Sequence, residues 1–76
     1  MQSSLTYTAK QIIGQRIKQL RKKQNLTQQQ LGDLVGIDRQ YMCRIENGKI
    51  NMTLNKLDKI IEALNCTPSE FFNLKQ

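Results

Sequence analysis

Apolar residues recur along the chain at intervals of three and four positions, a spacing that is typical of amphipathic helices. In the first such stretch, Ile13 and Ile17 belong to a helical pattern that runs to about Asn25. Thr8 and Gln11 have the spacing of a capping box, so they predict where this helix begins. No segment alternates apolar and polar residues strongly enough to predict a strand. The pattern therefore predicts an all-α protein.

Two short helices are predicted in the middle of the chain. Thr27 and Gln30 repeat the capping-box spacing, and Gly36 is expected to end the first of these helices. Asp38 is a candidate N-cap for the second helix, which the Asn-Gly pair at positions 47 and 48 is expected to end. Two helices joined so tightly must cross at a steep angle, as in a helix-turn-helix. The first short helix is expected to bury Leu31, Leu34 and Val35.

Two further helices complete the predicted architecture. Thr53 is expected to begin a fourth helix, and Thr67, Pro68 and Glu70 have the positions of a strong N-terminal cap for a short fifth helix. The sequence therefore predicts a compact five-helix bundle, with a flexible segment at 1–7 and a single domain at 8–76. The residues expected on the inner side of the fourth helix are Leu54, Leu57, Ile60, Ile61 and Leu64.

The positive charge is confined to one part of the chain. The formal net charge is +6, and residues 10–49 carry nine basic and three acidic residues, whereas residues 50–76 carry three of each sign. Such a basic half favours a polyanionic partner, which is either nucleic acid or an anionic membrane surface. On charge alone, a solvated face with spare lysines explains the excess equally well.

The residues that enzyme and metal sites commonly need are scarce. The chain has no histidine, and its two cysteines, Cys43 and Cys66, are too few for a disulfide framework or a zinc site. No glycine-rich phosphate loop, paired carboxylates or activated nucleophile is visible, so we expect no enzyme, cofactor, metal or small-molecule ligand. The sequence has neither a signal-peptide pattern nor a membrane-spanning stretch, which predicts a cytoplasmic protein. Cys66 is expected in the core.

The helix predicted after Asp38 has two chemically different faces. At about 100° per residue, Tyr41, Met42 and Ile45 fall on one side of this helix and polar side chains fall on the other. In the major groove of DNA, arginine donates two bonds to guanine and glutamine pairs with adenine. An ordinary solvated face is the alternative, but such faces usually pair glutamate with lysine, and this one has no acidic residue. The residues favoured for base reading are Arg39, Gln40, Cys43 and Arg44.

A resemblance to a known family extends from about Ile13 to Phe72. It is carried by "IGQRIKQLRKKQNLTQQQLGDLVGIDRQYMCRIENGK" and "TLNKLDKIIEALNCTPSEFF", which resemble the Cro/C1-type (XRE family) helix-turn-helix domains of DNA-binding transcriptional regulators. The stretch "IDRQYMCRIENGKINMTL" is also similar to the controller proteins of restriction-modification systems. The resemblance implies a lambda-repressor-like fold in which the second and third helices form the helix-turn-helix.

The resemblance also implies contacts with the DNA backbone. Gln28 falls at the family's first helix-turn-helix glutamine, where the amide and the helix N-terminus bind a phosphate, and the helix dipole favours this contact independently. Asn47 and Lys49 fall in the loop that meets the next phosphate. The base-reading positions are again those on the polar face around Arg44. The full set expected to bind phosphates is Thr27, Gln28, Tyr41, Asn47, Lys49 and Asn51.

Other positions are expected to be structural. Arg21 and Glu46 fall where many family members have a partly buried ion pair, and the alternative is two exposed charges that contribute little. Gly32 keeps the helix crossing small, but it replaces the family's usual alanine and should weaken its helix by up to about 1 kcal/mol. A short last helix cannot easily bury two adjacent phenylalanines, so one of them should pack inside. The residues expected at a homodimer interface are Ile50, Phe71, Phe72 and Leu74.

The function predicted from these features is sequence-specific binding of double-stranded DNA. A homodimer is expected to read a palindromic operator through the major groove, as a transcriptional repressor or autoregulator, because one such helix supplies too few base contacts alone. The alternative is a helical protein-interaction module such as an antitoxin or an adaptor. RNA binding is disfavoured because the chain lacks an aromatic stacking platform.

Overall fold

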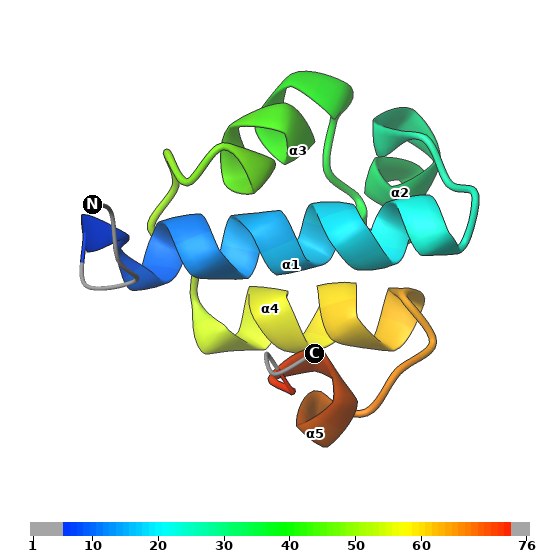
Figure 1. The fold of residues 1–76 in the computed structure, drawn as a ribbon. Coiled ribbons are helices and arrows are strands. Elements are labelled where there is room, and N and C mark those ends of the chain that lie inside the picture. Colours follow the sequence, from blue (N-terminus) through cyan, green and yellow to red (C-terminus); the bar gives the residue numbers. More distant parts are fainter. Residues whose placement is uncertain (1–5, 74–76) are drawn as a thin grey trace.

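Five helices make up the computed structural model, which describes residues 6–73. The helix α1 runs through the middle of the molecule, with α2 and α3 on one side of it and α4 and α5 on the other (Figure 1). No strand occurs within the described residues, so the predicted all-α fold is confirmed. The helices are α1 (Ala9–Lys23), α2 (Gln28–Val35), α3 (Arg39–Glu46), α4 (Leu54–Ala63) and α5 (Pro68–Phe71).

Each helix begins at a side-chain cap. The N-cap oxygen accepts a hydrogen bond from the backbone N–H three residues further along the chain, which satisfies one of the donors left free at a helix start. In α1, α2 and α5 the third helical residue also bonds back to the cap, which completes the predicted capping boxes. The five N-caps, all of which were predicted, are Thr8, Thr27, Asp38, Thr53 and Thr67.

One hydrophobic core lies among the helices. It consists of Ile17, Leu20, Leu31, Ile37, Met42, Ile45, Leu57, Ile60, Ile61, Leu64 and Phe71. Two predictions about it are wrong, because Leu34 is 62% exposed and Leu54 is 77% exposed. The buried side of α2 runs from Leu31 towards Val35, and Leu34 points about 80° away from the middle of that side. Leu54 is the first residue of α4, where a side chain leans beyond the end of its own helix.

Two glycines allow helices and turns to approach closely. A Cβ atom on Gly14 of α1 would lie 2.4 Å from the carbonyl oxygen of Ile45, so α1 and α3 meet backbone to backbone. A Cβ atom on Gly32 of α2 would lie 2.3 Å from the carbonyl oxygen of Ile37, in the turn before α3. Gly32 therefore keeps the crossing small as predicted. An alanine at position 32, as in the family, would therefore not stabilise this protein, because the carbonyl oxygen of Ile37 occupies the space that the alanine methyl group would need.

The turn between α2 and α3 depends on Gly36. Its φ of 75° is left-handed, a conformation that glycine adopts without steric cost, and the residue caps the end of α2 as predicted. The backbone N–H of Ile37 then donates to the carbonyl of Gly32 at 2.8 Å. This bond fixes the direction in which the chain enters α3, so the outward face of α3 is set by the turn.

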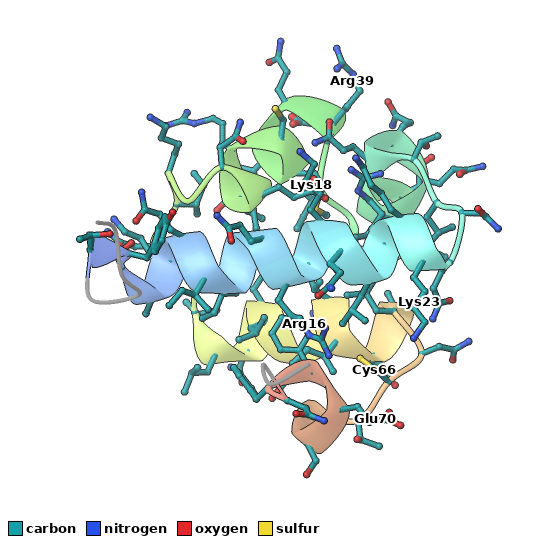
Figure 2. The ribbon with its side chains drawn as sticks, viewed as in Figure 1. Arg16, Lys18, Lys23, Arg39, Cys66 and Glu70 are labelled. Carbon is teal, nitrogen blue, oxygen red and sulfur yellow. The ribbon has the colours of Figure 1, made fainter. Side chains whose placement is uncertain are left out.

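The helix α5 is tied to α1 by an arginine that the sequence analysis did not single out. The Nε of Arg16 donates to the carbonyl of Phe71 at 2.7 Å, and its second terminal nitrogen donates to the carbonyl of Glu70 at 2.7 Å. Figure 2 shows Arg16 extending from α1 to the part of α5 that holds Glu70. The first of these bonds satisfies a carbonyl at the end of a short helix. The carbonyl of Glu70 also accepts a bond from the backbone N–H of Asn73 at 3.2 Å.

Candidate nucleic-acid interface

The outward face of α3 is polar and free of internal partners. Arg39, Gln40 and Arg44 are all exposed, and within residues 6–73 their side chains make no hydrogen bond or ion pair. Arg39 points away from the body of the molecule (Figure 2). The opposite side of the same helix places Met42 and Ile45 in the core. The structure therefore presents two guanidinium groups and one amide that are available for an external partner.

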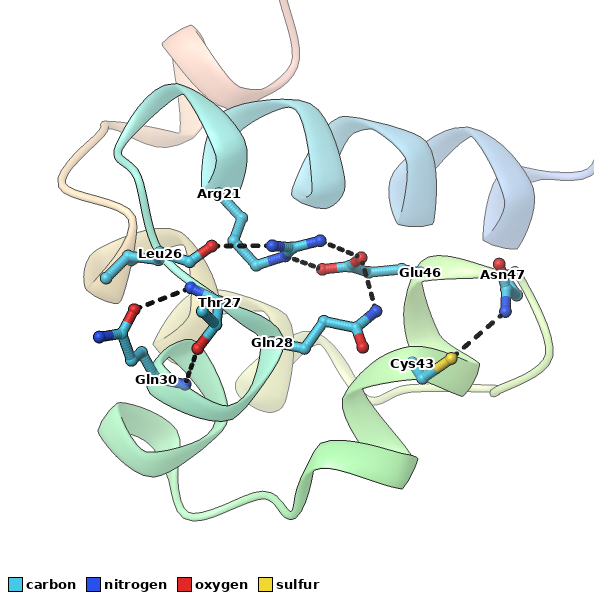
Figure 3. Close-up of polar contacts among 8 residues, drawn as sticks. All are labelled: Arg21, Leu26, Thr27, Gln28, Gln30, Cys43, Glu46 and Asn47. Carbon is cyan, nitrogen blue, oxygen red and sulfur yellow. Dashed lines mark hydrogen bonds and ion pairs between the residues drawn. The ribbon is translucent and has the colours of Figure 1, made fainter.

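Cys43 lies between these polar residues and is half-buried. Its sulfur accepts a hydrogen bond from the Nδ2 of Asn47 at 3.6 Å, one helical turn along the chain (Figure 3). Asn47 was predicted to bind phosphate, and its amide already has a hydrogen-bond partner within α3, the sulfur of Cys43.

Five of the six residues predicted to bind phosphate lie on two segments, at the two ends of the helix-turn-helix, and the sixth, Tyr41, lies within α3. Thr27 and Gln28 are at the N-terminus of α2, and the loop from α3 to α4 holds the exposed residues Lys49 and Asn51. Because the Nε2 of Gln28 donates to the Oε1 of Glu46 at 3.1 Å, the start of α2 and the end of α3 lie together. Both sets of residues predicted to bind the DNA backbone thus lie near the C-terminal end of α3.

An ion pair between Arg21 and Glu46 lies beneath this surface. The Nε of Arg21 lies 2.6 Å from one carboxylate oxygen of Glu46, and a terminal nitrogen lies 3.0 Å from the other oxygen. The remaining terminal nitrogen donates to the carbonyl of Leu26 at 2.8 Å (Figure 3). Both residues are buried, at 7% and 4% exposure. Paired in this way, the carboxylate presents little net charge to an approaching polyanion.

Tyr41 lies at the edge of the buried face and is half-buried. The Nζ of Lys56, on α4, lies 5.6 Å from the centre of the Tyr41 ring, within the range of a cation–π contact. The sequence analysis did not single out Lys56, because a contact between α3 and α4 leaves no pattern in the local sequence. This contact joins α3 to α4 beside the outward face of α3.

The four residues predicted for a dimer interface fall in different environments. Phe71 is fully buried, so it cannot be a surface contact, and that prediction is wrong because the residue fills the core. Phe72 is 49% exposed and packs edge to face against Phe71, with the ring centres 5.0 Å apart. Ile50 is half-buried against the core. Leu74 lies outside the described residues. Of the two phenylalanines, one packs inside as predicted.

Cys66 packs against the core but remains partly exposed. Partial burial raises the pKa of the Cys66 thiol, the carboxylate of Glu70 raises it further, and the guanidinium of Arg16 opposes the increase. The sulfur lies 3.8 Å from the carbonyl oxygen of Ile61. Within the described residues, no cluster of three or more histidine, cysteine or acidic side chains is arranged to hold a metal ion.

No helix within residues 6–73 has the length and apolar character needed to cross a membrane.

The tight crossing of α2 and α3, together with the unpartnered polar face of α3, defines the chain as a helix-turn-helix protein. Residues 17–71 match the helix-turn-helix family model HTH_3, and the chain belongs to this family.

Among its relatives are control proteins of restriction-modification systems. The control protein C.MunI of a Mycoplasma species is 43% identical over 61 residues, which are 79% of this chain and 82% of the relative. The controller protein C.AhdI from Aeromonas hydrophila, whose crystal structure is known, is 36% identical in sequence to this chain. The two structures superpose with a TM-score of 0.79, over 87% of this chain and the whole of C.AhdI.

A third relative has been solved with DNA. This is the controller protein C.Esp1396I, seen as a tetramer in complex with its natural 35 base-pair operator. It is 28% identical to the chain described here, with a TM-score of 0.77 over 84% of each chain.

Proposed function

We propose that this protein is a transcriptional regulator that binds double-stranded DNA in a sequence-specific manner and controls a restriction-modification system. The observation that carries the proposal is the outward face of α3. Arg39, Gln40 and Arg44 project from it without an internal partner, so their donors and the Gln40 amide oxygen are free to bond to DNA, and no acidic side chain lies among them to repel it. The family and the names of its controller relatives support the same function.

The chemistry of the face suits the edges of base pairs. A guanidinium group donates two parallel bonds to the O6 and N7 of guanine, and the amide of Gln40 matches the N6 and N7 of adenine. Arg39 and Arg44 are therefore the guanine readers in this proposal, and Cys43 provides a small contact surface for a thymine methyl group. Because α3 has eight residues, its outer face meets only a few base pairs.

Contacts with the DNA backbone hold α3 in the groove. Thr27 and Gln28 approach a phosphate at the start of α2, where the helix dipole also favours negative charge. Asn47, Lys49 and Asn51 approach another phosphate from the loop after α3, and the Tyr41 hydroxyl adds to this set. These contacts fix the position and orientation of α3 and carry little sequence information themselves.

The protein acts as a homodimer in this proposal. The exposed ring of Phe72, together with Ile50 and Leu74, forms the contact between the two copies. Two recognition helices then lie about 34 Å apart and read the two halves of an imperfect palindrome. A repressor or autoregulator of this kind works on DNA in the cytoplasm and needs no catalytic activity, cofactor or ligand.

Selection from random DNA tests this function. The purified protein should enrich an inverted repeat, and binding to that repeat should weaken steeply as salt increases, because each phosphate that is neutralised releases counterions. An inverted repeat of the same sequence upstream of the protein's own gene would support autoregulation. Binding to no DNA, together with salt-insensitive binding to a protein partner, would instead favour the interaction-module alternative.

A further inference from the structure

Three consecutive glutamines begin α2, and each amide has a different partner. The amide of Gln29 donates to Asp33 at 3.0 Å, within the same helix. The amide oxygen of Gln30 accepts from the backbone N–H of Thr27 at 2.9 Å, as part of the cap. Only Gln28 bonds to another helix, because its Nε2 donates to Glu46 on α3 at 3.1 Å. Gln28 is also the half-buried member of the three.

The partner of Gln28 is itself held firmly. Glu46 is 4% exposed, and its two carboxylate oxygens accept bonds from Arg21 at 2.6 and 3.0 Å. The oxygen that accepts the longer of these bonds also accepts the bond from Gln28 (Figure 3). A short, two-point contact between a guanidinium and a carboxylate allows little movement. Glu46 is therefore a fixed acceptor in a buried site.

This acceptor decides how the amide of Gln28 is oriented. An ionised carboxylate can only accept hydrogen bonds, so the nitrogen end of the amide, and not its oxygen end, must face Glu46. An amide nitrogen carries two N–H groups, and one of them is used by Glu46. The second N–H of Gln28 stays free at the N-terminus of α2, where the helix dipole attracts an anion.

We infer that Glu46 is a positioning residue for DNA binding, which fixes the amide of Gln28 so that its free N–H meets a backbone phosphate. This inference rests on the proposed function. Arg21 makes the arrangement possible, because it cancels the negative charge that would otherwise repel that phosphate. The carboxylate of Glu46, at the end of α3, then determines where α2 contacts the DNA backbone. Because Glu46 belongs to α3, phosphate binding by α2 is linked to the position of the base-reading face of α3.

Affinity measurements on four variants and the wild-type protein test the inference. Gln28→Ala should weaken binding to selected and random DNA alike, by about tenfold, through loss of a hydrogen bond to a charged group. The salt dependence should keep its slope, because a neutral side chain releases no counterion. Gln29→Ala is the matched control, since its amide bonds only within α2, and it should bind as the wild type does.

Glu46→Ala and the double variant Gln28→Ala with Glu46→Ala complete a double-mutant cycle, because alanine leaves no side-chain oxygen to accept the bond from Gln28. Once Glu46 no longer fixes the amide, removing Gln28 should cost less than about twofold in affinity, because the two changes act on one interaction. An equal tenfold loss in both backgrounds would show that Gln28 works without Glu46, and would overturn the inference.

A second measurement needs no variant, which matters because Glu46→Ala leaves the buried Arg21 without its partner and is prone to unfold. In the free wild-type protein, NMR relaxation of side-chain amide nitrogens should show Gln28 nearly as rigid as the backbone, with an order parameter of about 0.85. The amide of Gln29 should be more mobile. Adding operator DNA should shift one amide proton of Gln28 strongly. A mobile Gln28 amide, or one that DNA leaves unchanged, would overturn the inference.

The outcomes separate this inference from the proposed function. If Gln28→Ala binds selected DNA as tightly as the wild type does, the positioning role is wrong while sequence-specific binding stands. If the wild-type protein binds no DNA, both are wrong.

Discussion

In the proposed function, individual side chains divide the DNA-facing surface into base readers and phosphate-binding residues. Arg44 is exposed on the outer face of α3, whereas Lys49 is exposed in the loop that follows α3. A guanidinium that donates two bonds to one guanine discriminates between bases, but an ammonium near a phosphate attracts any sequence equally. The two residues carry the same charge, so a comparison between them isolates the effect of position.

We expect Arg44→Ala to weaken binding to the selected repeat by about 1 to 3 kcal/mol and to relax the preference at one base pair in each half-site. Lys49→Ala should weaken binding to all sequences nearly alike and reduce the salt slope by about 0.9 for each phosphate that the variant no longer neutralises. Titrations of selected and random DNA at several salt concentrations measure both effects. Equal losses on both kinds of DNA for both variants would contradict the assignment.

The thiol of Cys66 gives a pH-dependent prediction. Because partial burial raises its pKa in the folded protein above the ordinary value of 9.0, the unfolded chain loses this proton first as the pH rises. The stability that the protonated thiol contributes is therefore complete below the ordinary value and is lost as the pH rises through the higher pKa of the folded protein. The unfolding free energy of the wild type, compared with that of Cys66→Ser, should therefore fall as the pH rises above about 9. Urea unfolding measures this difference, and a constant difference would refute the prediction.

At the scale of helices, glycine determines how closely α1 and α3 approach. Gly14 faces the carbonyl oxygens of Ile45 and Glu46, and a Cβ atom there would lie 2.4 and 2.7 Å from them. Backbone atoms cannot rotate aside as a flexible side chain can, so an added methyl group must push the two helices apart. The same displacement would move Glu46 relative to Arg21.

Gly14→Ala should therefore destabilise the protein by about 1 to 3 kcal/mol, even though alanine is the better helix former in isolation. Gln15→Ala changes the neighbouring, exposed position of α1 and should alter stability by no more than about 0.5 kcal/mol. Chemical denaturation of both variants measures the effect. A stabilised Gly14→Ala protein would mean that α1 and α3 are not packed as closely as described.

The helix boundaries could be predicted from the sequence, because their causes are local. Each N-cap, such as Thr27, bonds to a residue three positions away, so the cap is visible in four letters of sequence. The exposure of Leu34 and Leu54 could not be predicted, since periodicity gives the apolar side of a helix but not how far its neighbours extend over it. The two bonds from Arg16 to α5 span 54 and 55 positions, and the bond from Gln28 to Glu46 spans 18 positions. No local sequence pattern predicts contacts between residues so far apart in the chain.

At the scale of the whole molecule, exposed apolar side chains show where a second copy fits in the proposal. Phe72 is 49% exposed at the end of α5, and Leu34 is 62% exposed on α2. Of these two residues, only Phe72 belongs to the proposed dimer interface. Two residues of similar character in different places therefore provide a test and its control.

Phe72→Asp should convert the dimer to monomers and weaken operator binding, because a charge cannot be buried between two copies without a large desolvation cost. Leu34→Asp should leave the dimer intact. Sedimentation equilibrium measures the oligomeric state, and thermal unfolding shows whether the monomers remain folded. A dimeric Phe72→Asp protein would place the interface elsewhere.

The side chains of Arg39, Gln40 and Arg44 take part in no bond that holds the described part of the fold together. In the proposed function, substitutions at these positions change the DNA sequence that is recognised at little cost in stability, since exposed sites away from caps and networks usually alter stability by less than about 0.5 kcal/mol. A lineage can thus acquire a new operator preference in single steps while every intermediate stays folded. Two such regulators in one cell can diverge until neither recognises the other's DNA.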